Sequence, residues 1–285
     1  MFYTPPSMIQ PSSTLVYLRF YAATTLGILL TFAWSFGETP LPAPPLKNPS
    51  TKNEIKLLVT AENPEQALKS LNLNEGHAVA QTVCFFDTGD AALAAVNLIL
   101  RAREKPGEAG ESTVKLRAIP GETELSAAEQ AIPLEQDWTH PDGPILSRSL
   151  NQDALAAGWV SKVAAGEVPA LTLFNEEQRA LITARVKDFK WENLKCYGPV
   201  EARVWRQQCK LPGFAGGVTV ELWHLKNADR VQDILEVSAK GKAETPLQAQ
   251  ALAKQFFAAA KAAGLGEPSG QTKTKQVLDF FKPGR

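Results

Sequence analysis

Short runs in which apolar and polar residues alternate recur along the chain from residue 52 onward. Alternation with a period of two is typical of strands, whereas an amphipathic helix repeats about every 3.6 residues. The pattern predicts strands at residues 54–60, 80–87, 99–104, 112–118, 132–138, 186–191, 200–206, 219–225 and 234–240. Helix-favouring runs lie at residues 64–71, 90–98, 149–165, 175–183 and 246–263. Two clusters of strands with helices between them indicate an antiparallel α+β domain built from two similar halves.

The N-terminal region has a different pattern. Residues 20–36 form an apolar run without charges, preceded by Arg19 and followed by a proline-rich segment. This length suits a signal-peptide core or a short membrane anchor better than a buried helix, so we expect an exported protein. A retained anchor and an ordinary helix stay open as alternatives. The predicted organisation is a signal peptide or anchor at 1–37, a linker at 38–51, a folded domain at 52–265 and a tail at 266–285 that can dock through residues 277–281.

Composition limits the classes of function. The chain has 285 residues and 44% apolar content, which is enough to bury a core. Lysine plus arginine and aspartate plus glutamate both number 30, so no net field attracts nucleic acid or anionic lipid. We therefore expect no nucleic-acid partner, and membrane contact only through an uncleaved N-terminal segment. Any anion site must be local.

The three cysteines form no closely spaced pair and the three histidines are scattered, so a structural zinc site is not expected. Cys196 and Cys209 could form a disulfide in an oxidising compartment if their strands are neighbours. The alternative is that both are buried thiols. Cys84 lies in an apolar strand and is predicted to be free.

Charged residues recur at strand spacing, two residues apart. Such pairs are Glu54 and Lys56, Arg101 and Arg103, Lys115 and Arg117, and Glu135 and Asp137, while Glu236 and Lys240 share one face of the last strand. Side chains two apart on a strand lie on the same face. That face is either a solvated outer surface or the interior of a closed barrel with a charged lumen.

A charged lumen predicts a specific chemistry. Arginine and lysine stabilise phosphoryl oxygens, whereas paired carboxylates bind Mg²⁺ or Mn²⁺. Cations alone make a binding site for a phosphate-rich molecule. With a metal ion held by the carboxylates, the site could hydrolyse that molecule.

The order of these motifs resembles the CYTH domain, also called the triphosphate tunnel metalloenzyme fold. The resemblance rests on the acid-x-Lys strand at Glu54, the FFDT sequence at 85–88, the RxR strand at Arg101, the TVKLR strand at 113–117 and the LEQD sequence at 134–137. It implies an eight-stranded antiparallel tunnel with peripheral helices. It also implies that a triphosphate or polyphosphate binds inside and is commonly hydrolysed with a divalent metal.

The resemblance also assigns roles by position. It implies Glu54 and Lys56 as catalytic residues; Arg101, Arg103, Lys115, Arg117, Arg203 and Lys240 as substrate-binding residues; and Glu54, Glu135, Asp137, Glu221 and Glu236 as ligands of Mg²⁺ or Mn²⁺. One departure weakens the metal site, because Lys52 replaces the first glutamate of the ExExK motif.

Three functions follow as hypotheses. The first is a CYTH-like protein that binds a phosphate-rich small molecule and hydrolyses it with a metal. The second is a non-catalytic anion-binding or scaffold protein that has lost the metal site. The third is a membrane-tethered structural protein whose sheet charges face outward.

Overall fold

The computed structural model describes residues 52–59, 64–119, 121 and 125–282. By internal contacts the chain divides into two units, Met1–Glu38 and Thr39–Arg285, and every described residue belongs to the second. The expected signal peptide or anchor and the proline-rich linker lie outside the described residues. Within the described ranges, no helix combines the length and apolar character needed to span a bilayer.

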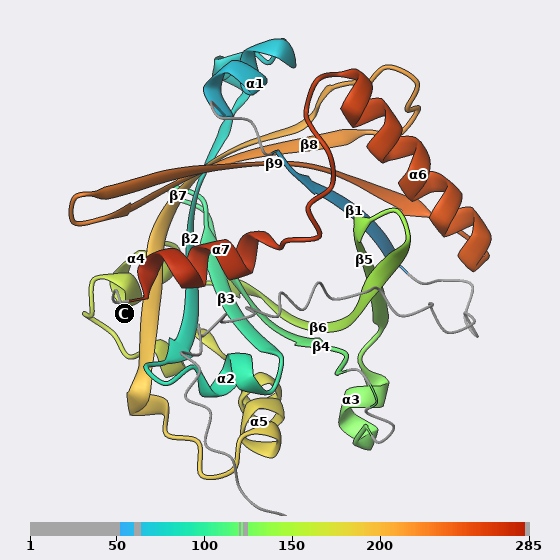
Figure 1. Cartoon of the computed structure of the whole chain (residues 1–285). Helices are drawn as coiled ribbons and strands as arrows, with labels where there is room; N and C mark the ends of the chain where they lie inside the picture. Colours follow the sequence, from blue (N-terminus) through green and yellow to red (C-terminus); the bar gives the residue numbers. More distant parts are fainter. Residues whose placement is uncertain (1–51, 60–63, 120, 122–124, 283–285) are drawn as a thin grey trace, which may run out of the picture. The chain divides into compact units, whose positions relative to one another are not determined.

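The described residues form nine strands that close into a barrel (Figure 1). They are β1 (Lys52–Leu58), β2 (Val79–Thr88), β3 (Leu98–Glu104), β4 (Gly110–Arg117), β5 (Leu134–His140), β6 (Gly143–Leu155), β7 (Leu194–Cys209), β8 (Val218–Asn227) and β9 (Arg230–Lys242). Their order around the barrel is β1-β5-β6-β4-β3-β2-β7-β8-β9, and β9 pairs with β1. Closure turns one face of each strand toward a common interior.

The predicted α+β fold with a closed barrel is confirmed, but two details differ. The described part of the chain has nine strands instead of eight, and β1 and β5 are parallel. The strand that the sequence missed is β6, whose C-terminal half was expected to be helical. Its Ser149, Asn151 and Asp153 line the interior and are polar. The run therefore lacks the apolar alternation that marks a strand.

Helices pack on the barrel and join its strands. They are α1 (Pro64–Ser70), α2 (Ala92–Ala95), α3 (Ala127–Ala131), α4 (Trp159–Ala164), α5 (Glu176–Arg185), α6 (Pro246–Ala262) and α7 (Lys273–Phe281), with 3-10 turns η1 (Glu75–His77), η2 (Ala170–Leu173) and η3 (Trp191–Asn193). The helices predicted at 64–71, 175–183 and 246–263 are confirmed as α1, α5 and α6. The side chain of Asn175 caps α5 by accepting from the Gln178 N–H.

Strand β7 corrects two expectations. Residues 186–190, predicted to be part of a strand, connect α5 to η3, which begins at Trp191, and β7 begins only at Leu194. Cys196 and Cys209 both lie on this one strand, so at about 3.3 Å per residue they are about 40 Å apart. A disulfide needs Cα atoms within about 7 Å, so these two cannot pair. The described cysteines are free, and the Cys84 thiol instead donates a hydrogen bond to Cys196.

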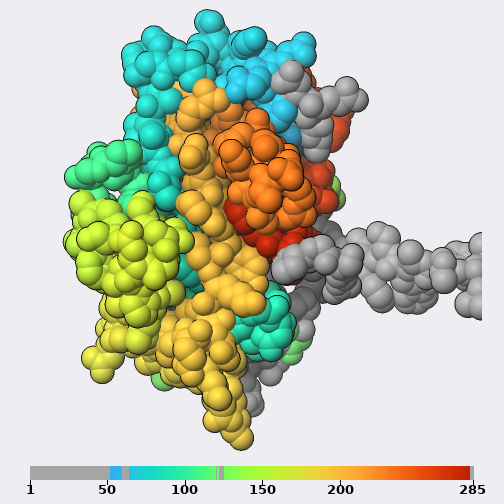
Figure 2. Space-filling model, turned by 90° about the vertical axis from the view of Figure 1, so that its left-hand side faces the viewer, coloured from blue at the N-terminus to red at the C-terminus, as the bar shows by residue number. Residues whose placement is uncertain are grey.

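Much of the hydrophobic core lies outside the barrel, under the helices. Along β3, Leu98, Leu100 and Ala102 are buried with residues of α4 and α5, while Arg101 and Arg103 point to the interior. On another side, α6 packs on the outer faces of β1 and β9. Figure 2 shows β7 running along the surface from the region of α1 to α5. On β3, and beneath α6, the barrel thus buries its apolar side chains on the outside, and the charged side chains of β3 face inward.

The C-terminal helix α7 lies across the barrel against β2, β7 and β8 (Figure 1). Its Val277 is fully buried and Phe280 nearly so. Both belong to an apolar cluster with Phe85 and Trp223, which line the interior. The segment expected as a polar tail therefore ends in a helix that packs into the barrel.

Candidate functional site in the barrel lumen

A cavity of about 1000 Å³ occupies the interior of the barrel and is lined from each of the nine described strands and from the start of α7. Among the described residues, ten Lys or Arg and eight Asp or Glu side chains line it. We call this cavity the lumen. The charges at strand spacing therefore face a shared interior, and the alternative of a solvated outer face does not hold.

The lumen brings together eleven of the twelve predicted site residues: Glu54, Lys56, Arg101, Arg103, Lys115, Arg117, Glu135, Asp137, Glu221, Glu236 and Lys240. The twelfth, Arg203, does not reach it. Its guanidinium lies outside and donates to Glu75 and Glu65, each at 2.8 Å. The physical reason is that β7 turns an apolar face inward, including Val200 and Val204, which join the cluster around α7.

The first carboxylate pair joins β1 and β5. Glu54 lies directly opposite Asp137 in the strand register. The Lys56 ammonium bridges them, at 2.9 Å from Glu54 and 2.8 Å from Asp137. Although burial disfavours its charge, the two carboxylates raise the pKa of Lys56 above its ordinary value. Lys56 is therefore a fixed cation of the wall.

The Asp137 carboxylate has three partners: the ammonium groups of Lys56 and Lys115 and the hydroxyl of Ser147. Lys115 forms an ion pair with it from β4, and the Ser147 hydroxyl donates to it at 3.0 Å. Burial opposes its ionisation, but the Lys56 and Lys115 ammonium groups hold the pKa of Asp137 well below its usual range. Burial and the neighbouring Lys56 lower the pKa of Lys115. These groups form one compensated network.

The second carboxylate pair joins β8 and β9, where Glu221 lies directly opposite Glu236. Like charges in that position destabilise a sheet unless a cation lies between them. Here the cation is Lys273 of α7, with Nζ at 2.5 Å from Glu221 and 2.9 Å from Glu236. The ammonium also lies 4.0 Å from the centre of the Trp223 ring, in a cation–π contact.

The pKa values of the two carboxyl groups in this pair shift in opposite directions. Burial raises the pKa of Glu221, but the Lys273 ammonium and a hydrogen bond from Trp223 outweigh it and bring the pKa down to about 2. Burial and the neighbouring Glu221 raise the pKa of Glu236. One ammonium thus serves two carboxylates, and the second of them is less well compensated.

The opposite wall, on β3 and β4, is rich in cations. Arg101 and Arg103 share one neighbouring carboxylate, Glu111, at 3.8 and 2.6 Å. Burial and the adjacent Arg103 lower the pKa of Arg101, because both disfavour its positive charge. Both side chains keep about 30% exposure to the lumen, Arg101 at 31% and Arg103 at 28%. This wall can accept a further anion.

Lys52, which replaces a motif glutamate, lies at the rim. Its side chain is 73% exposed, and its ammonium is 3.9 Å from Glu135 across the parallel β1–β5 pair. It therefore adds a cation to the lumen without entering the Glu54–Asp137 pair.

Sequence reasoning missed six charged residues of the lumen: Glu111, Asp153, Arg206, Lys242, Glu244 and Lys273. Glu111 continues the alternation of β4 by one step, a signal hidden by the glycine-rich turn before it. Arg206 lines the lumen from β7, on the strand face opposite to Arg203. Lys273 has no strand pattern, because it reaches the lumen from a helix near the end of the chain.

The carboxylates do not form a ready metal centre. Over the described ranges, no group of three or more Asp, Glu, His or Cys is placed to hold a metal ion. Each opposed carboxylate pair instead holds a lysine ammonium. In this arrangement the residues do not fit a divalent cation.

No family model matches the sequence, and no curated protein matches it. Among solved structures, the chain is similar to a candidate adenylate cyclase from Bacillus halodurans, with a TM-score of 0.49 and 18% identity over 80% of this chain and 97% of that one. It is also similar to an adenylyl cyclase candidate from Hippeastrum with a dominant triphosphatase activity, with a TM-score of 0.49 and 17% identity over 80% and 95% of the two chains.

The expectation from the sequence motifs can be judged on this chain alone. Its strands close into a barrel, its predicted RxR, TVKLR and acid-x-Lys strands all face the lumen, and ten basic and eight acidic side chains line that lumen. A closed barrel with charged residues on its inner face is therefore the architecture that the motif resemblance implied.

Proposed function

We propose that the lumen binds a phosphate-rich small molecule, such as a triphosphate or a short polyphosphate. The observation that carries this proposal is the pair Arg101 and Arg103, which share the single carboxylate of Glu111. Two guanidinium groups side by side are stabilised by an anion with several oxygens, because each can donate two parallel hydrogen bonds. Phosphate chains have this chemistry.

The remaining lumen charges support the same ligand class. Lys115 and Arg117 continue the cation-rich wall on β4, and Lys240 and Arg206 add cations from β9 and β7. Five carboxylates of the lumen already pair with lysines of the chain itself: those of Glu54, Glu135, Asp137, Glu221 and Glu236. A ligand anion therefore meets cations more readily than uncompensated carboxylates.

Titration calorimetry with tripolyphosphate in the presence of EDTA tests the proposal. We expect Arg101→Ala to weaken binding by about tenfold or more, because a charge-assisted hydrogen bond is lost. Arg203→Ala removes the same side chain from the outer face and should leave the affinity unchanged. Equal affinities of the Arg101 and Arg203 variants, or no binding by the wild type, would contradict the proposal.

Metal-dependent hydrolysis is the second candidate, favoured by the two directly opposed carboxylate pairs. Because a lysine now bridges each pair, we derive no catalytic step through a metal, and the roles of Glu54, Glu135, Asp137, Glu221 and Glu236 as ligands stay predictions. Phosphate release from tripolyphosphate with and without Mn²⁺, beside a Lys115→Ala variant, decides between binder and hydrolase. Release that needs Mn²⁺ and fails in the variant would make the protein a hydrolase.

Export, membrane attachment through the N-terminal segment and the absence of a nucleic-acid partner are also proposals. They rest on the apolar run at 20–36 and on the balanced net charge.

A further inference from the structure

Two free thiols lie in contact between neighbouring strands of the barrel. The Cys84 thiol of β2 donates a hydrogen bond to Cys196 of β7, and neither residue is part of a disulfide. Cys84 is fully buried, whereas Cys196 is only partly buried. Both side chains belong to the apolar cluster beneath α4, α5 and η2. One member of the pair is therefore within reach of a small solute.

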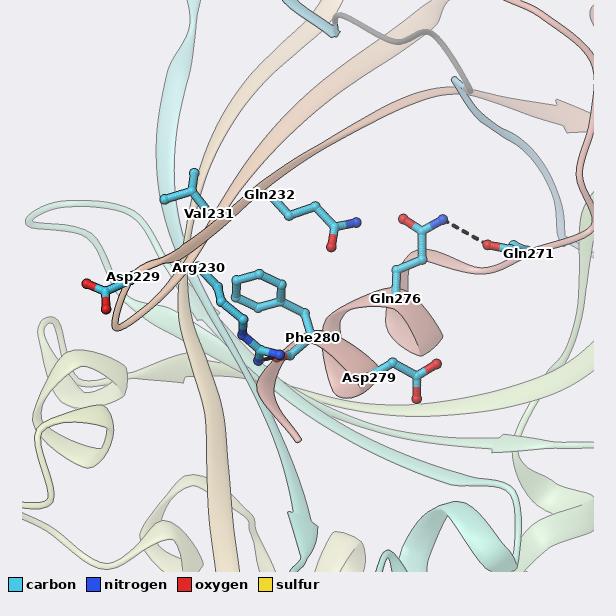
Figure 3. A pocket seen from close by; sticks show the side chains of 8 residues that line it. All are labelled: Asp229, Arg230, Val231, Gln232, Gln271, Gln276, Asp279 and Phe280. Atoms are coloured by element: carbon cyan, nitrogen blue, oxygen red, sulfur yellow. Dashed lines mark hydrogen bonds between the residues drawn. The ribbon is translucent and has the colours of Figure 1, made fainter. Parts of the chain in front are cut away.

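The thiol pair lies on the outer side of the barrel wall. Phe85 lines the lumen, so the adjacent Cys84 points to the opposite face of β2. On the inner side, Phe85 belongs to the same apolar cluster as Phe280 of α7. Figure 3 shows Phe280 beside Arg230, whose guanidinium is 4.9 Å from the ring centre. A solute that comes from outside the barrel meets Cys196 before Cys84.

The backbone at this place is irregular. The register of β2 against β7 shifts between Val83 and Phe85, so Cys84 lies at a β-bulge. A Cβ atom added to Gly198 would lie 3.4 Å from the Cys84 Cα atom, so the β7 backbone runs close to Cys84. A bulge interrupts the regular ladder of strand pairing. Shortening the thiol contact to the 2.05 Å or so of a disulfide therefore needs adjustment at the bulge alone.

The two thiols differ in reactivity. The hydrogen bond from Cys84 lowers the pKa of Cys196. The same hydrogen bond, followed by burial, raises the pKa of Cys84. Because the thiolate is the nucleophile in thiol chemistry, Cys196 is the first of the two to attack an oxidant. Cys84 is placed to attack the oxidised sulfur of Cys196 in the next step.

We propose that Cys84 and Cys196 are a peroxide-sensitive pair, which hydrogen peroxide oxidises to a disulfide between β2 and β7. The Cys196 thiolate attacks one peroxide oxygen and breaks the O–O bond, and the leaving hydroxide takes up the proton that Cys196 released. This step forms a sulfenic acid on Cys196 and one water. The Cys84 sulfur then attacks the Cys196 sulfur and breaks its S–O bond, and the leaving hydroxide takes the Cys84 proton. The two thiols lose two electrons, and the peroxide is reduced to two waters.

The position of the pair gives the disulfide a structural effect. Strands β1–β6 come from the first part of the chain and β7–β9 from the last part. In the described barrel these two sets meet at the β2–β7 pair and at the β1–β9 pair. A bond from Cys84 to Cys196 covalently joins the first of these pairs and closes a loop of about 110 residues. Cross-links that close long loops restrict the unfolded chain most, so oxidation should raise Tm.

The first test treats the reduced full chain with a small excess of hydrogen peroxide. Free thiols are then blocked with iodoacetamide, and the protein is digested and examined by mass spectrometry without reduction. We expect a peptide pair joined through Cys84 and Cys196, and Cys209→Ala, the matched control, should form the same link. Cys84→Ala should stop at the sulfenic acid of Cys196, which dimedone traps. A wild type that links other cysteines, or in which Cys196 becomes a sulfinic acid while Cys84 keeps its thiol, overturns the proposal.

The second test compares Tm before and after oxidation by differential scanning fluorimetry. The wild type should gain roughly 5–10 °C, and dithiothreitol should reverse the gain. Cys84→Ala should show no gain. If this buried substitution prevents folding, Cys196→Ala replaces it, because Cys196 is only partly buried and its loss removes the same bond. An unchanged or lower Tm of the oxidised wild type overturns the proposal.

The thiol pair and the lumen can be tested separately. Cys84 and Cys196 do not line the lumen, so Cys84→Ala should bind tripolyphosphate as the wild type does. Failure of tripolyphosphate to bind would refute the proposed ligand, and the peptide link would still decide the fate of the thiols.

Discussion

Asp137→Asn separates the two roles of charge in the lumen, because it should destabilise the protein while improving anion binding. Asp137 is buried, with Lys56 at 2.8 Å and Lys115 also paired to it. Its depressed pKa means that the substitution removes a full negative charge at neutral pH. Lys56 keeps Glu54 at 2.9 Å and Lys115 keeps Glu135 at 3.6 Å, so neither lysine loses all compensation.

The magnitudes follow from these contacts. Breaking a buried pair costs about 3–5 kcal/mol, and the remaining partners reduce this to about 2–3 kcal/mol. For a domain of this size, that lowers Tm by about 5–10 °C. A ligand charge about 8 Å from the removed carboxylate gains about 2 kcal/mol at an effective dielectric constant of about 20, before screening by salt. Tripolyphosphate should therefore bind about tenfold or more tightly.

Differential scanning fluorimetry and titration calorimetry in EDTA measure the two effects. Asp233→Asn is the control, because it removes a carboxylate whose partner, His224, is exposed on the outer face of β8. It should change neither quantity appreciably. If folded Asp137→Asn binds tripolyphosphate as weakly as the wild type or more weakly, the lumen does not act as an anion site through its net charge.

Two further predictions concern groups outside the lumen. Among the described cysteines, Cys196 should react first with iodoacetamide in the native protein, and mass spectrometry measures the order of labelling. The reason is that the hydrogen bond from Cys84 lowers the pKa of Cys196, whereas burial raises the pKa of Cys209. Fastest labelling of Cys209 would contradict this prediction. Glu129→Gln should cost about 1–3 kcal/mol of unfolding free energy in urea at neutral pH, since Glu129 is buried against Arg185. Burial raises the pKa of Glu129, but Arg185 and Ser126 bring the pKa below its ordinary value. The ionised carboxylate therefore stabilises the fold at a pH above the pKa of Glu129 in the unfolded chain. This contribution is lost as the pH falls through the pKa of Glu129 in the folded protein. The difference from wild type should therefore shrink below about pH 4.5; a difference that grows at low pH would refute the assignment.

The lumen could be predicted from the sequence because the charged residues recur every two residues, which is also the side-chain period of a strand. Arg101 and Arg103, or Glu135 and Asp137, fall on one face whatever the exact limits of the strand. Once the sheet is closed, those faces must meet. The same logic failed at Arg203, since it assumed that a charged residue marks the inner face. On β7 the inner face is apolar at Val200 and Val204, where α7 packs against it, and the inward charge comes from Arg206 instead.

Lys273 could not have been found by strand periodicity, and the reason is physical. Its place depends on three separate segments: β8 and β9 set the two carboxylates opposite each other, and α7 carries the ammonium between them. Nothing local in the α7 sequence requires this, since a lysine at a helix start is locally unfavourable. The contact between Lys273 and the two carboxylates is therefore specified only by the tertiary structure.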